Sequence, residues 1–337
     1  MIIVLRKDAT QADLDHIIEK IQQVGLKPHI SKGVEKTLVG AIGEDDKIAQ
    51  LPIEAFPGVE SVMRLTRPYK LASREFQPED TMIEVGGVTI GGRQIIVGAG
   101  PCSVERGEHF FRIAEEIKKA GASMLRGGAF KPRTSPYSFQ GLGREGLEIL
   151  AEARRRTGLA IVTEVMDTRQ VELVCEFADM IQIGARNIQN FDLLREVGRT
   201  QTPVLLKRGM ATTYKEFLMS AEYIMDQGNK KVVLCERGIR TFETHTRNTL
   251  DVCAVPVLQF ESHLPVFVDP SHAGGYWRWV EPLARAAVAA GADGLLIEVH
   301  TNPEEAWSDG AQTLRTDKFA RLIEGLRRVA ASVDRTI

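Results

Sequence analysis

From residue 94 onward, short and almost continuous apolar runs alternate with longer helical stretches, and this alternation limits the possible folds more than any other feature. The runs are rich in Val, Ile and Leu, as expected for parallel strands that are buried on both faces. We count eight strand–helix units. The expected strands span residues 94–100, 123–130, 160–165, 180–185, 204–208, 231–237, 266–272 and 294–300.

Eight strand–helix units in roughly 250 residues are typical of a (β/α)8 TIM barrel. A doubly wound open sheet is the alternative, but no Gly-rich dinucleotide fingerprint follows the first strand, and this disfavours it. Residues 82–92 have the pattern of a β-hairpin with a Gly-Gly turn. We therefore predict an α/β protein in which residues 82–337 form the barrel domain.

Residues 1–66 have a different pattern, which predicts a small α+β domain. Thr10 is expected to cap a helix with apolar residues at helical spacing, and Gly25 is expected to end it. With four strands and a short second helix within 45–56, the order becomes βαββαβ, which fits a ferredoxin-like fold. Residues 67–81 are polar, contain two prolines, and are interpreted as a linker.

Overall composition argues against a nucleic-acid or membrane partner. The formal net charge is −2, so any basic cluster must be local. The N-terminal apolar run is too short for a signal peptide, and no run has the length of a membrane span. The four cysteines are scattered without a CxxC pattern, which favours a reduced, cytoplasmic compartment.

Charged or metal-capable residues lie where each of the eight strands runs into its following loop. Active sites of TIM barrels lie at this end, whereas chance would place such residues at both ends. The sequence therefore predicts a functional site there. The residues concerned are Cys102, Arg126, Lys131, Arg133, Thr134, Glu164, Arg186, Lys207, Arg208, Glu236, Arg237, Asp269, His272, Glu298, His300 and Asp309.

A first group within this set is Cys102, His272, Glu298 and Asp309. The last strand of a closed barrel lies beside both the first and the seventh, so these four side chains can converge. A thiolate, an imidazole and two carboxylates suit a divalent transition metal, but they do not choose among Fe, Mn, Co and Zn. Alone, Cys102 would be read as a small buried apolar residue. The three converging partners favour a metal ligand instead.

A second group is cationic, and its members would repel one another unless anions compensate them. Arg suits bidentate capture of phosphate and carboxylate, and Lys acts as a point charge. We expect more than one anionic group to bind, such as two phosphates and a carboxylate. His245 follows the sixth strand and is a further candidate for this site. The cationic residues are Arg126, Lys131, Arg133, Arg186, Lys207 and Arg237.

Seven motifs over residues 82–330 together resemble those of 3-deoxy-D-arabino-heptulosonate 7-phosphate (DAHP) synthase of the type I-beta branch, the first enzyme of the shikimate pathway. The N-terminal unit resembles the ferredoxin-like, ACT-like regulatory domain of some members. One departure is the GGYWRW segment, where the family has a basic pair. The motifs are GPCSVE, RGGAFKPRTSPYSFQG, QIGARNIQNF, LLKRG, LCERGIRTFE, VDPSHAGG and EVHTNPEEAWSDGAQTL.

The resemblance implies condensation of phosphoenolpyruvate (PEP) with erythrose 4-phosphate, with the metal on the four residues named above. It implies that Arg186 and Arg237 hold the PEP phosphate, whereas a second set of residues, Arg126, Lys131 and Lys207, holds its carboxylate. Arg133 and Thr134 would hold the sugar phosphate. Lys131 or a metal-bound water would be the general acid. Glu164 or Asp269 would take the proton of the attacking water.

Two other functions are compatible with much of this pattern. The sister enzyme that condenses PEP with arabinose 5-phosphate, 3-deoxy-D-manno-octulosonate (KDO) 8-phosphate synthase, would share the barrel and the PEP cations. Members of that family have a motif similar to K-A-N-R-S where this chain reads KPRTS, and this difference argues against KDO 8-phosphate synthase. A non-catalytic sensor of phosphorylated metabolites is the other rival, and the intact metal set disfavours it.

The N-terminal unit is not needed to build a barrel, so regulation is its expected use, with an oligomer spacer as the alternative. By resemblance it would bind tyrosine or phenylalanine between paired domains. His29 and Ser31 alternate on one strand face and are candidate contacts. Family similarity also suggests a homotetramer.

Overall fold

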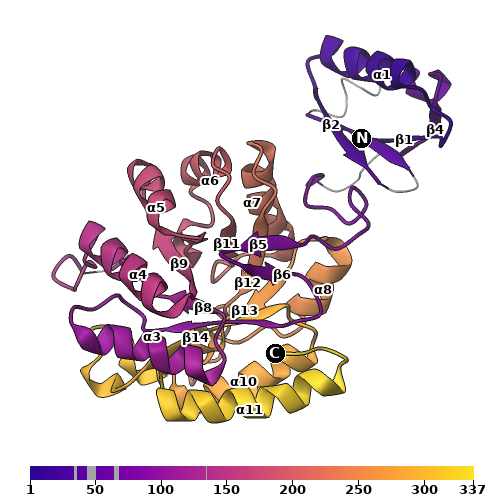
Figure 1. Cartoon of the computed structure of the whole chain (residues 1–337). Coiled ribbons are helices and arrows are strands. Elements are labelled where there is room, and N and C mark those ends of the chain that lie inside the picture. Colours follow the sequence, from indigo (N-terminus) through magenta and orange to yellow (C-terminus); the bar gives the residue numbers. More distant parts are fainter. Residues whose placement is uncertain (34–35, 44–50, 64–67, 134) are drawn as a thin grey trace. The chain divides into compact units, whose positions relative to one another are not determined.

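The computed structural model of the chain describes residues 1–33, 36–43, 51–63, 68–133 and 135–337. The chain divides into two compact units, Met1–Glu79 and Asp80–Ile337 (Figure 1). Within the described residues, no helix is both long enough and apolar enough to cross a membrane.

The first unit is a four-stranded antiparallel sheet with a helix, in the ferredoxin-like arrangement that the sequence predicts. Its strands lie in the order β2-β3-β1-β4. Because β1 lies between β3 and β4, the chain must cross over between its hairpins, as the βαββαβ order requires. The elements are β1 (Ile2–Leu5), α1 (Gln11–Gln23), β2 (Lys27–Lys32), β3 (Thr37–Ile42) and β4 (Val59–Met63).

Helix α1 begins where the sequence predicts. The Thr10 hydroxyl accepts a hydrogen bond from the Asp13 N–H, and the Asp13 carboxylate accepts one from the Thr10 N–H at 2.8 Å, which completes a capping box. The apolar side of the helix packs on one face of the sheet. Of the expected second helix, residues 44–50 lie outside the described part of the chain, and Ile53–Ala55 form a 3-10 turn.

The described part of the predicted linker, residues 68–79, groups with the first unit. The Phe76 ring is buried and lies 5.0 Å from the His29 ring, centroid to centroid. A Cβ on Gly40 would lie 2.6 Å from Phe76 Cε2, so the absence of a side chain at Gly40 makes room for the ring. An aromatic residue in this polar stretch thus covers part of the sheet.

The second unit is a closed (β/α)8 barrel, as predicted, and its residues are all described except Thr134. Eight parallel strands pair in sequence, and β14 pairs with both β13 and β7, which closes the ring. The strands are β7 (Ile96–Gly100), β8 (Met124–Arg126), β9 (Ala160–Val165), β10 (Met180–Ile183), β11 (Val204–Lys207), β12 (Val232–Glu236), β13 (Val266–Val268) and β14 (Gly294–His300).

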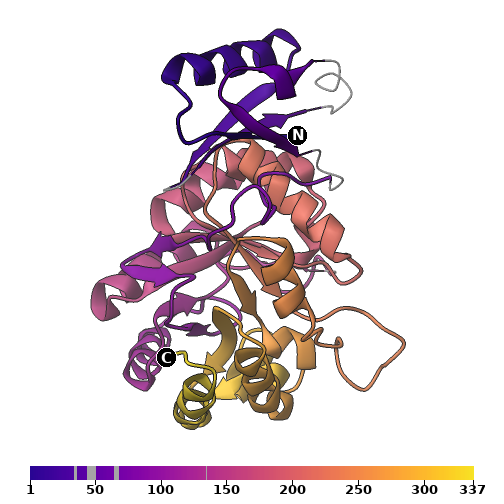
Figure 2. The same ribbon diagram turned by 90° about the vertical axis from the view of Figure 1, so that its right-hand side faces the viewer.

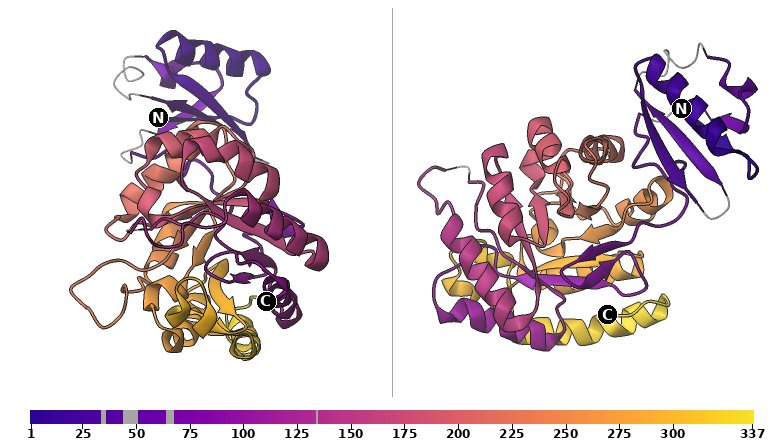
Figure 3. Two further views of the ribbon diagram at one scale, coloured as in Figure 1. Left: turned by 90° about the vertical axis from the view of Figure 1, so that its left-hand side faces the viewer. Right: turned by 45° about the horizontal axis from the view of Figure 1, so that its top comes forward.

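Helices lie outside this ring of strands, as Figure 1 and the two views of Figure 3 show. A short extra strand, β15 (Leu314–Arg315), pairs with the end of β14. The helices are α3 (Glu108–Ala120), α4 (Arg144–Thr157), α5 (Val171–Phe177), α6 (Phe191–Gly198), α7 (Tyr214–Asp226), α8 (Ala254–Glu261), α9 (Pro270–Gly274), α10 (Trp277–Ala289) and α11 (Thr316–Ser332).

The predicted hairpin, β5 (Ile83–Val85) and β6 (Val88–Ile90), covers the amino-terminal end of the barrel (Figure 2). Its side chains Ile83, Val85 and Ile90 are almost fully buried and join the apolar cluster formed by the first residues of several barrel strands. Burial of this apolar surface stabilises the hairpin and seals the end of the barrel that lies away from the predicted site.

The pairing of β14 with β7 brings distant parts of the sequence together. Glu298 lies opposite Gly100, two residues before Cys102. On its other side, β14 pairs with β13, the strand that precedes Asp269 and His272. Closure of the barrel therefore places the first, seventh and eighth strand ends beside one another.

Replacing Ile83 with Ala should lower the free energy of unfolding by about 2–5 kcal/mol, because the smaller side chain leaves a cavity in the barrel core. The control is Met82→Ala, since Met82 is 57% exposed and its truncation should cost about 0.5 kcal/mol or less. Urea-induced unfolding would measure both. Equal losses would contradict the assigned role of the hairpin.

Candidate active site

A cavity of about 200 Å³ lies at the carboxyl-terminal ends of the barrel strands. It is strongly cationic, and all six of the predicted cations line it. Glu164, His272 and Asp309 line it as well. The full set of lining residues is Arg126, Lys131, Pro132, Arg133, Glu164, Gln182, Gly184, Ala185, Arg186, Lys207, Arg237, Arg247, His272 and Asp309.

Alternation along the strands decides which charges face the cavity, because successive side chains of a strand point to opposite sides. Lys207 and Arg237 line the cavity. Their neighbours Arg208 and Glu236 do not, and instead form a buried ion pair in which Arg208 Nη1 lies 2.8 Å from Glu236 Oε2. Arg208 also pairs with Asp251 at 2.8 Å. Two of the charges at the strand ends are thus structural.

The four predicted metal ligands gather at one side of the cavity. Ligand atoms of Cys102, Glu298 and Asp309 all lie within 4.8 Å of one another. The Cys102 thiol donates to Asp309 Oδ2 at 3.1 Å, and His272 Nε2 lies 3.5 Å from Glu298 Oε1. A sulfur, an imidazole nitrogen and two carboxylates in such proximity are donors that suit a divalent transition metal.

Asp269 fixes the His272 ring by hydrogen bonds to its backbone and to the ring nitrogen that faces away from the metal group. The His272 backbone N–H donates to Asp269 Oδ1 at 2.9 Å, and His272 Nδ1 lies 2.7 Å from Asp269 Oδ2. Lys207 Nζ pairs with the same Oδ2. This leaves Nε2 of His272 directed at Glu298, which is the arrangement of a metal-ligating histidine whose other nitrogen is held by a carboxylate.

Protonation states in this group follow from burial and from neighbouring charges. Burial lowers the pKa of His272, which favours the neutral ring that binds metals. Burial, and then the charge of Glu298, raises the pKa of the Cys102 thiol to about 11. Burial alone would raise the pKa of Asp309, but the hydrogen bond from Cys102 and the charge of Arg247 bring it to about 2.

Some cavity cations are compensated within the chain, and others are not. Arg126 Nη1 donates to the Pro101 carbonyl at 2.9 Å and to Glu298 Oε1 at 3.1 Å. Nε of Arg126 and Nη1 of Arg237 are nevertheless buried without a hydrogen-bond partner, and burial lowers the pKa of the Arg237 guanidinium. Arg186 makes no ion pair with another described residue. A buried cationic donor without a partner, such as Arg237 Nη1, indicates a site for an anion.

Glu164, near the end of β9, is a second acidic residue that lines the cavity, besides Asp309. Its Oε2 accepts a hydrogen bond from Gln182 Nε2 at 3.1 Å, whereas its Oε1 is buried without a partner. A Cβ on Gly184 would lie 2.0 Å from Oε1, so only glycine leaves room for the carboxylate here. A partnerless carboxylate oxygen beside the cavity is a candidate acceptor of a proton.

Sequence reasoning missed Arg247 and Gln312. Arg247 Nη1 donates to Gln312 Oε1 at 2.7 Å and lies 3.5 Å from Asp309 Oδ1. Gln312 Nε2 donates to Glu298 Oε2 at 2.7 Å. Arg247 is therefore linked directly to Asp309 and through Gln312 to Glu298, although it stands eleven residues after the end of β12. A rule based on strand ends cannot find it.

Other predicted residues lie elsewhere. Among the described residues, His245 is not part of the cavity lining, and its ring lies 6.2 Å from that of Trp279. Thr134 lies outside the described residues. His29 and Ser31 lie on β2 of the first unit, opposite Gly40 and Leu38 of β3. Their strand neighbour Ile30 is opposite Val39, which belongs to the core under α1. His29 and Ser31 thus point to the other face of the sheet.

Two family profiles match the chain. That of the DAHP synthetase I family matches residues 75–334, and that of the DAHP synthase ferredoxin-like domain matches residues 1–67. The chain belongs to the DAHP synthetase I family. It is an enzyme of this family, and the relationship indicated by the sequence motifs is confirmed.

Relatives support this assignment over nearly the whole chain. Phospho-2-dehydro-3-deoxyheptonate aldolase of Thermotoga maritima is 52% identical over 98% of each chain. A crystal structure of that aldolase matches with a TM-score of 0.79 at 50% identity, over 99% of this chain and 98% of the other. The 2-dehydro-3-deoxyphosphooctonate aldolase of Syntrophobacter fumaroxidans is 34% identical over 72% of this chain and 90% of its own.

Replacing Asp269 with Asn should destabilise the protein by about 3 kcal/mol, because it leaves the Lys207 ammonium buried without its counter-charge. The pKa of Asp269 is lower in the folded protein, so the stabilisation is complete near neutral pH and is lost only in strong acid. Urea unfolding near neutral pH would measure the difference.

The matched control is Asp192→Asn, which removes an 87% exposed carboxylate paired with Arg195. It should change the stability by less than about 1 kcal/mol. A loss for Asp269→Asn no larger than that of the control would refute the assigned pairing.

Proposed function

We propose that this enzyme condenses phosphoenolpyruvate with erythrose 4-phosphate and water to give DAHP and inorganic phosphate. The observation that carries the proposal is the buried, partnerless Nη1 of Arg237 in a cationic cavity beside the Cys102, His272, Glu298 and Asp309 group. A sugar phosphate and an enol phosphate acid together supply the phosphates and carboxylate that such a cavity requires.

The cations divide between the two substrates. Arg186 and Arg237, which have no carboxylate partner at hydrogen-bond distance among the described residues, would bind the PEP phosphate. Arg126, Lys131 and Lys207 would bind its carboxylate, near the metal group. Arg133 would bind the sugar phosphate together with Thr134. Fixed charges of this kind orient both substrates and replace the hydration that they lose.

A divalent metal ion would be held by the four residues of the metal group. The fit rests on the mixed donor set, on the proximity of its atoms, and on the support of His272 by Asp269. When bound, the ion would polarise the aldehyde of the sugar. The donors do not distinguish Fe, Mn, Co and Zn.

The remaining chemistry concerns protons. The C3 carbon of PEP forms a bond to the aldehyde carbon, the aldehyde oxygen takes a proton, and water adds at C2 before phosphate leaves. Lys131 Nζ lies 2.9 Å from Cys102 Sγ, at the edge of the metal group, and is the proposed proton donor to the aldehyde oxygen. Glu164, with its partnerless oxygen, is proposed to take the proton of the water. Both oxygens of Asp269 are engaged, so we assign it to holding His272.

The rival reaction uses arabinose 5-phosphate in place of erythrose 4-phosphate. Relatives named for the octulosonate reaction share only about a third of their residues with this chain, whereas the heptonate aldolase shares half over its full length. The loop KPRTS, which carries Arg133, favours the shorter sugar.

The purified protein should consume PEP when erythrose 4-phosphate and Mn²⁺ are present, and a chelator should abolish this activity because the aldehyde is then no longer activated. PEP loss at its ultraviolet absorbance is the measurement. Parallel reactions with arabinose 5-phosphate control for sugar specificity. Consumption that persists after exhaustive chelation would reject the metal, and preference for the longer sugar would establish the rival.

We further propose that the first unit is regulatory and that it binds tyrosine or phenylalanine between paired copies. Its His29 and Ser31 share the sheet face opposite α1, where an aromatic ligand can pack beside Phe76. Binding between copies requires an oligomer, for which family similarity suggests a tetramer. We also propose a cytoplasmic location, in keeping with the scattered cysteines.

Removal of residues 1–79 should leave an active enzyme that no longer responds to either amino acid, because the barrel is a compact unit by itself. A truncated form of the Thermotoga maritima enzyme, which matches 79% of this chain, has been solved on its own. Initial rates with and without each amino acid would be compared for both lengths. Inhibition that survives the truncation would place the effector site in the barrel.

A further inference from the structure

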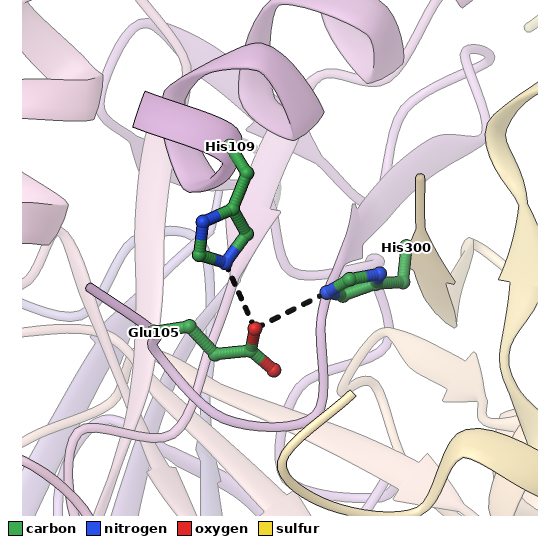
Figure 4. Close-up of side chains that lie close together, drawn as sticks. All are labelled: Glu105, His109 and His300. Atoms are coloured by element: carbon green, nitrogen blue, oxygen red, sulfur yellow. Dashed lines mark hydrogen bonds and ion pairs between the residues drawn. The ribbon is translucent and has the colours of Figure 1, made fainter. Parts of the chain in front are cut away.

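Three side chains next to the metal group form a second compact cluster (Figure 4). Glu105 lies in the loop after β7, His109 in the first turn of α3, and His300 at the end of β14. His109 Nε2 lies 2.9 Å from Glu105 Oε2, and His300 Nε2 lies 3.2 Å from the same oxygen. The Trp307 backbone N–H donates to the other oxygen, Oε1, at 2.9 Å. One carboxylate therefore joins three separate segments.

Two imidazoles and a carboxylate resemble a metal site, and their ligand atoms lie within 4.8 Å of one another. The tautomer of His300 argues against this interpretation. The Asn302 N–H donates to His300 Nδ1 at 2.9 Å, so the proton of the neutral ring lies on Nε2 and points at Glu105. Binding a metal at Nε2 would move that proton to Nδ1, where it would face the Asn302 N–H.

Glu105 is therefore the common acceptor of a hydrogen-bond cluster. It is 2% exposed. Burial alone would raise its pKa, but the hydrogen bonds from His300, Trp307 and His109 outweigh this and hold the pKa below its ordinary value. An ionised carboxylate that accepts three hydrogen bonds fixes the position of every donor.

The donors lie close in sequence to two of the proposed metal ligands. Cys102 stands three residues before Glu105, and Asp309 stands two residues after Trp307. A second link lies between them, because the hydroxyls of Ser103 and Ser308 share a hydrogen bond at 2.5 Å. The loops that carry Cys102 and Asp309 are thus joined twice outside the metal group itself.

We propose that Glu105, held by His109 and His300, is a positioning residue that sets the separation of Cys102 and Asp309 and so tunes the affinity for the metal ion. This inference rests on the metal site proposed above. The Trp307 ring also packs edge-to-face on Phe139, at 5.0 Å between ring centroids. The Phe139 carbonyl in turn accepts a hydrogen bond from Arg133, the residue proposed to bind the sugar phosphate.

The decisive variant is Glu105→Gln. Its amide can accept at one oxygen only, so its NH₂ group must face either the two imidazole N–H groups or the Trp307 N–H. The full-length protein, freed of metal by a chelator, would be titrated with Mn²⁺ while free Mn²⁺ is followed by electron paramagnetic resonance. We expect the dissociation constant to rise about tenfold or more, as for loss of outer-shell support. Hydrogen exchange at the Trp307 amide should also accelerate.

The matched control is Glu108→Gln. Glu108 stands three residues after Glu105, at the start of α3, but its side chain is 79% exposed and pairs with Arg156. Its replacement changes the net charge equally and should leave the Mn²⁺ affinity unchanged. A second pair of variants, at His109, tests the inference even if Glu105→Gln does not fold. His109→Gln keeps an N–H donor and should bind Mn²⁺ more tightly than His109→Ala.

Each outcome decides between specific alternatives. Unchanged Mn²⁺ affinity in Glu105→Gln and in both His109 variants would overturn the inference. Two bound Mn²⁺ ions per chain, with one lost in Glu105→Gln, would show that the cluster is itself a metal site and would also overturn it. A wild-type protein that binds no Mn²⁺, Fe²⁺, Co²⁺ or Zn²⁺ would refute the metal site of the proposed function, and this inference with it.

Discussion

Closure of the barrel by pairing of β14 with β7 is the constraint on which the site depends. The two strands are separated by nearly two hundred residues of sequence, yet their register sets Glu298 opposite Gly100. Because β13 flanks β14 on the other side, His272 arrives at the same place. An open sheet of the same strands would leave the first and last ends far apart, and the group of sulfur, imidazole and carboxylates would not assemble.

Charge compensation is the second organising principle of the site. The end of the barrel concentrates cations, and the fold neutralises some of them internally: Asp269 pairs with Lys207, Glu298 with Arg126, and Glu236 with Arg208. Arg186 and Arg237 also line the cavity, and neither forms an ion pair with another described residue. Burial of a charge is costly unless the charge is paired, so the buried Nη1 of Arg237 marks a place where the partner must come from outside the chain.

Sequence patterns predicted the barrel, the ferredoxin-like unit and the capped start of α1 because each depends on local periodicity or on a short capping motif. They also predicted the six cations, since the ends of parallel strands share one edge. They could not predict Arg247, whose reach to Asp309 depends on the path of a long loop. They placed Lys207 and not Arg208 in the cationic group, but they could not predict that Arg208 forms buried pairs with Glu236 and Asp251, because those pairs depend on contacts between segments. The packing of Phe76 within a polar stretch likewise depends on contacts between segments, with Gly40 and His29 as its neighbours.

The hairpin of β5 and β6 limits where substrates and products can enter and leave the barrel. Ile83, Val85 and Ile90 plug one end with tightly packed hydrocarbon, so no passage runs along the barrel axis. Exchange between the cavity and solvent therefore does not run through the hairpin, and we expect it at the carboxyl-terminal ends of the strands. Released phosphate and the seven-carbon product of the proposed reaction would leave at the end of the barrel at which new substrates enter. Product that stays bound would therefore compete with the substrates for the cavity.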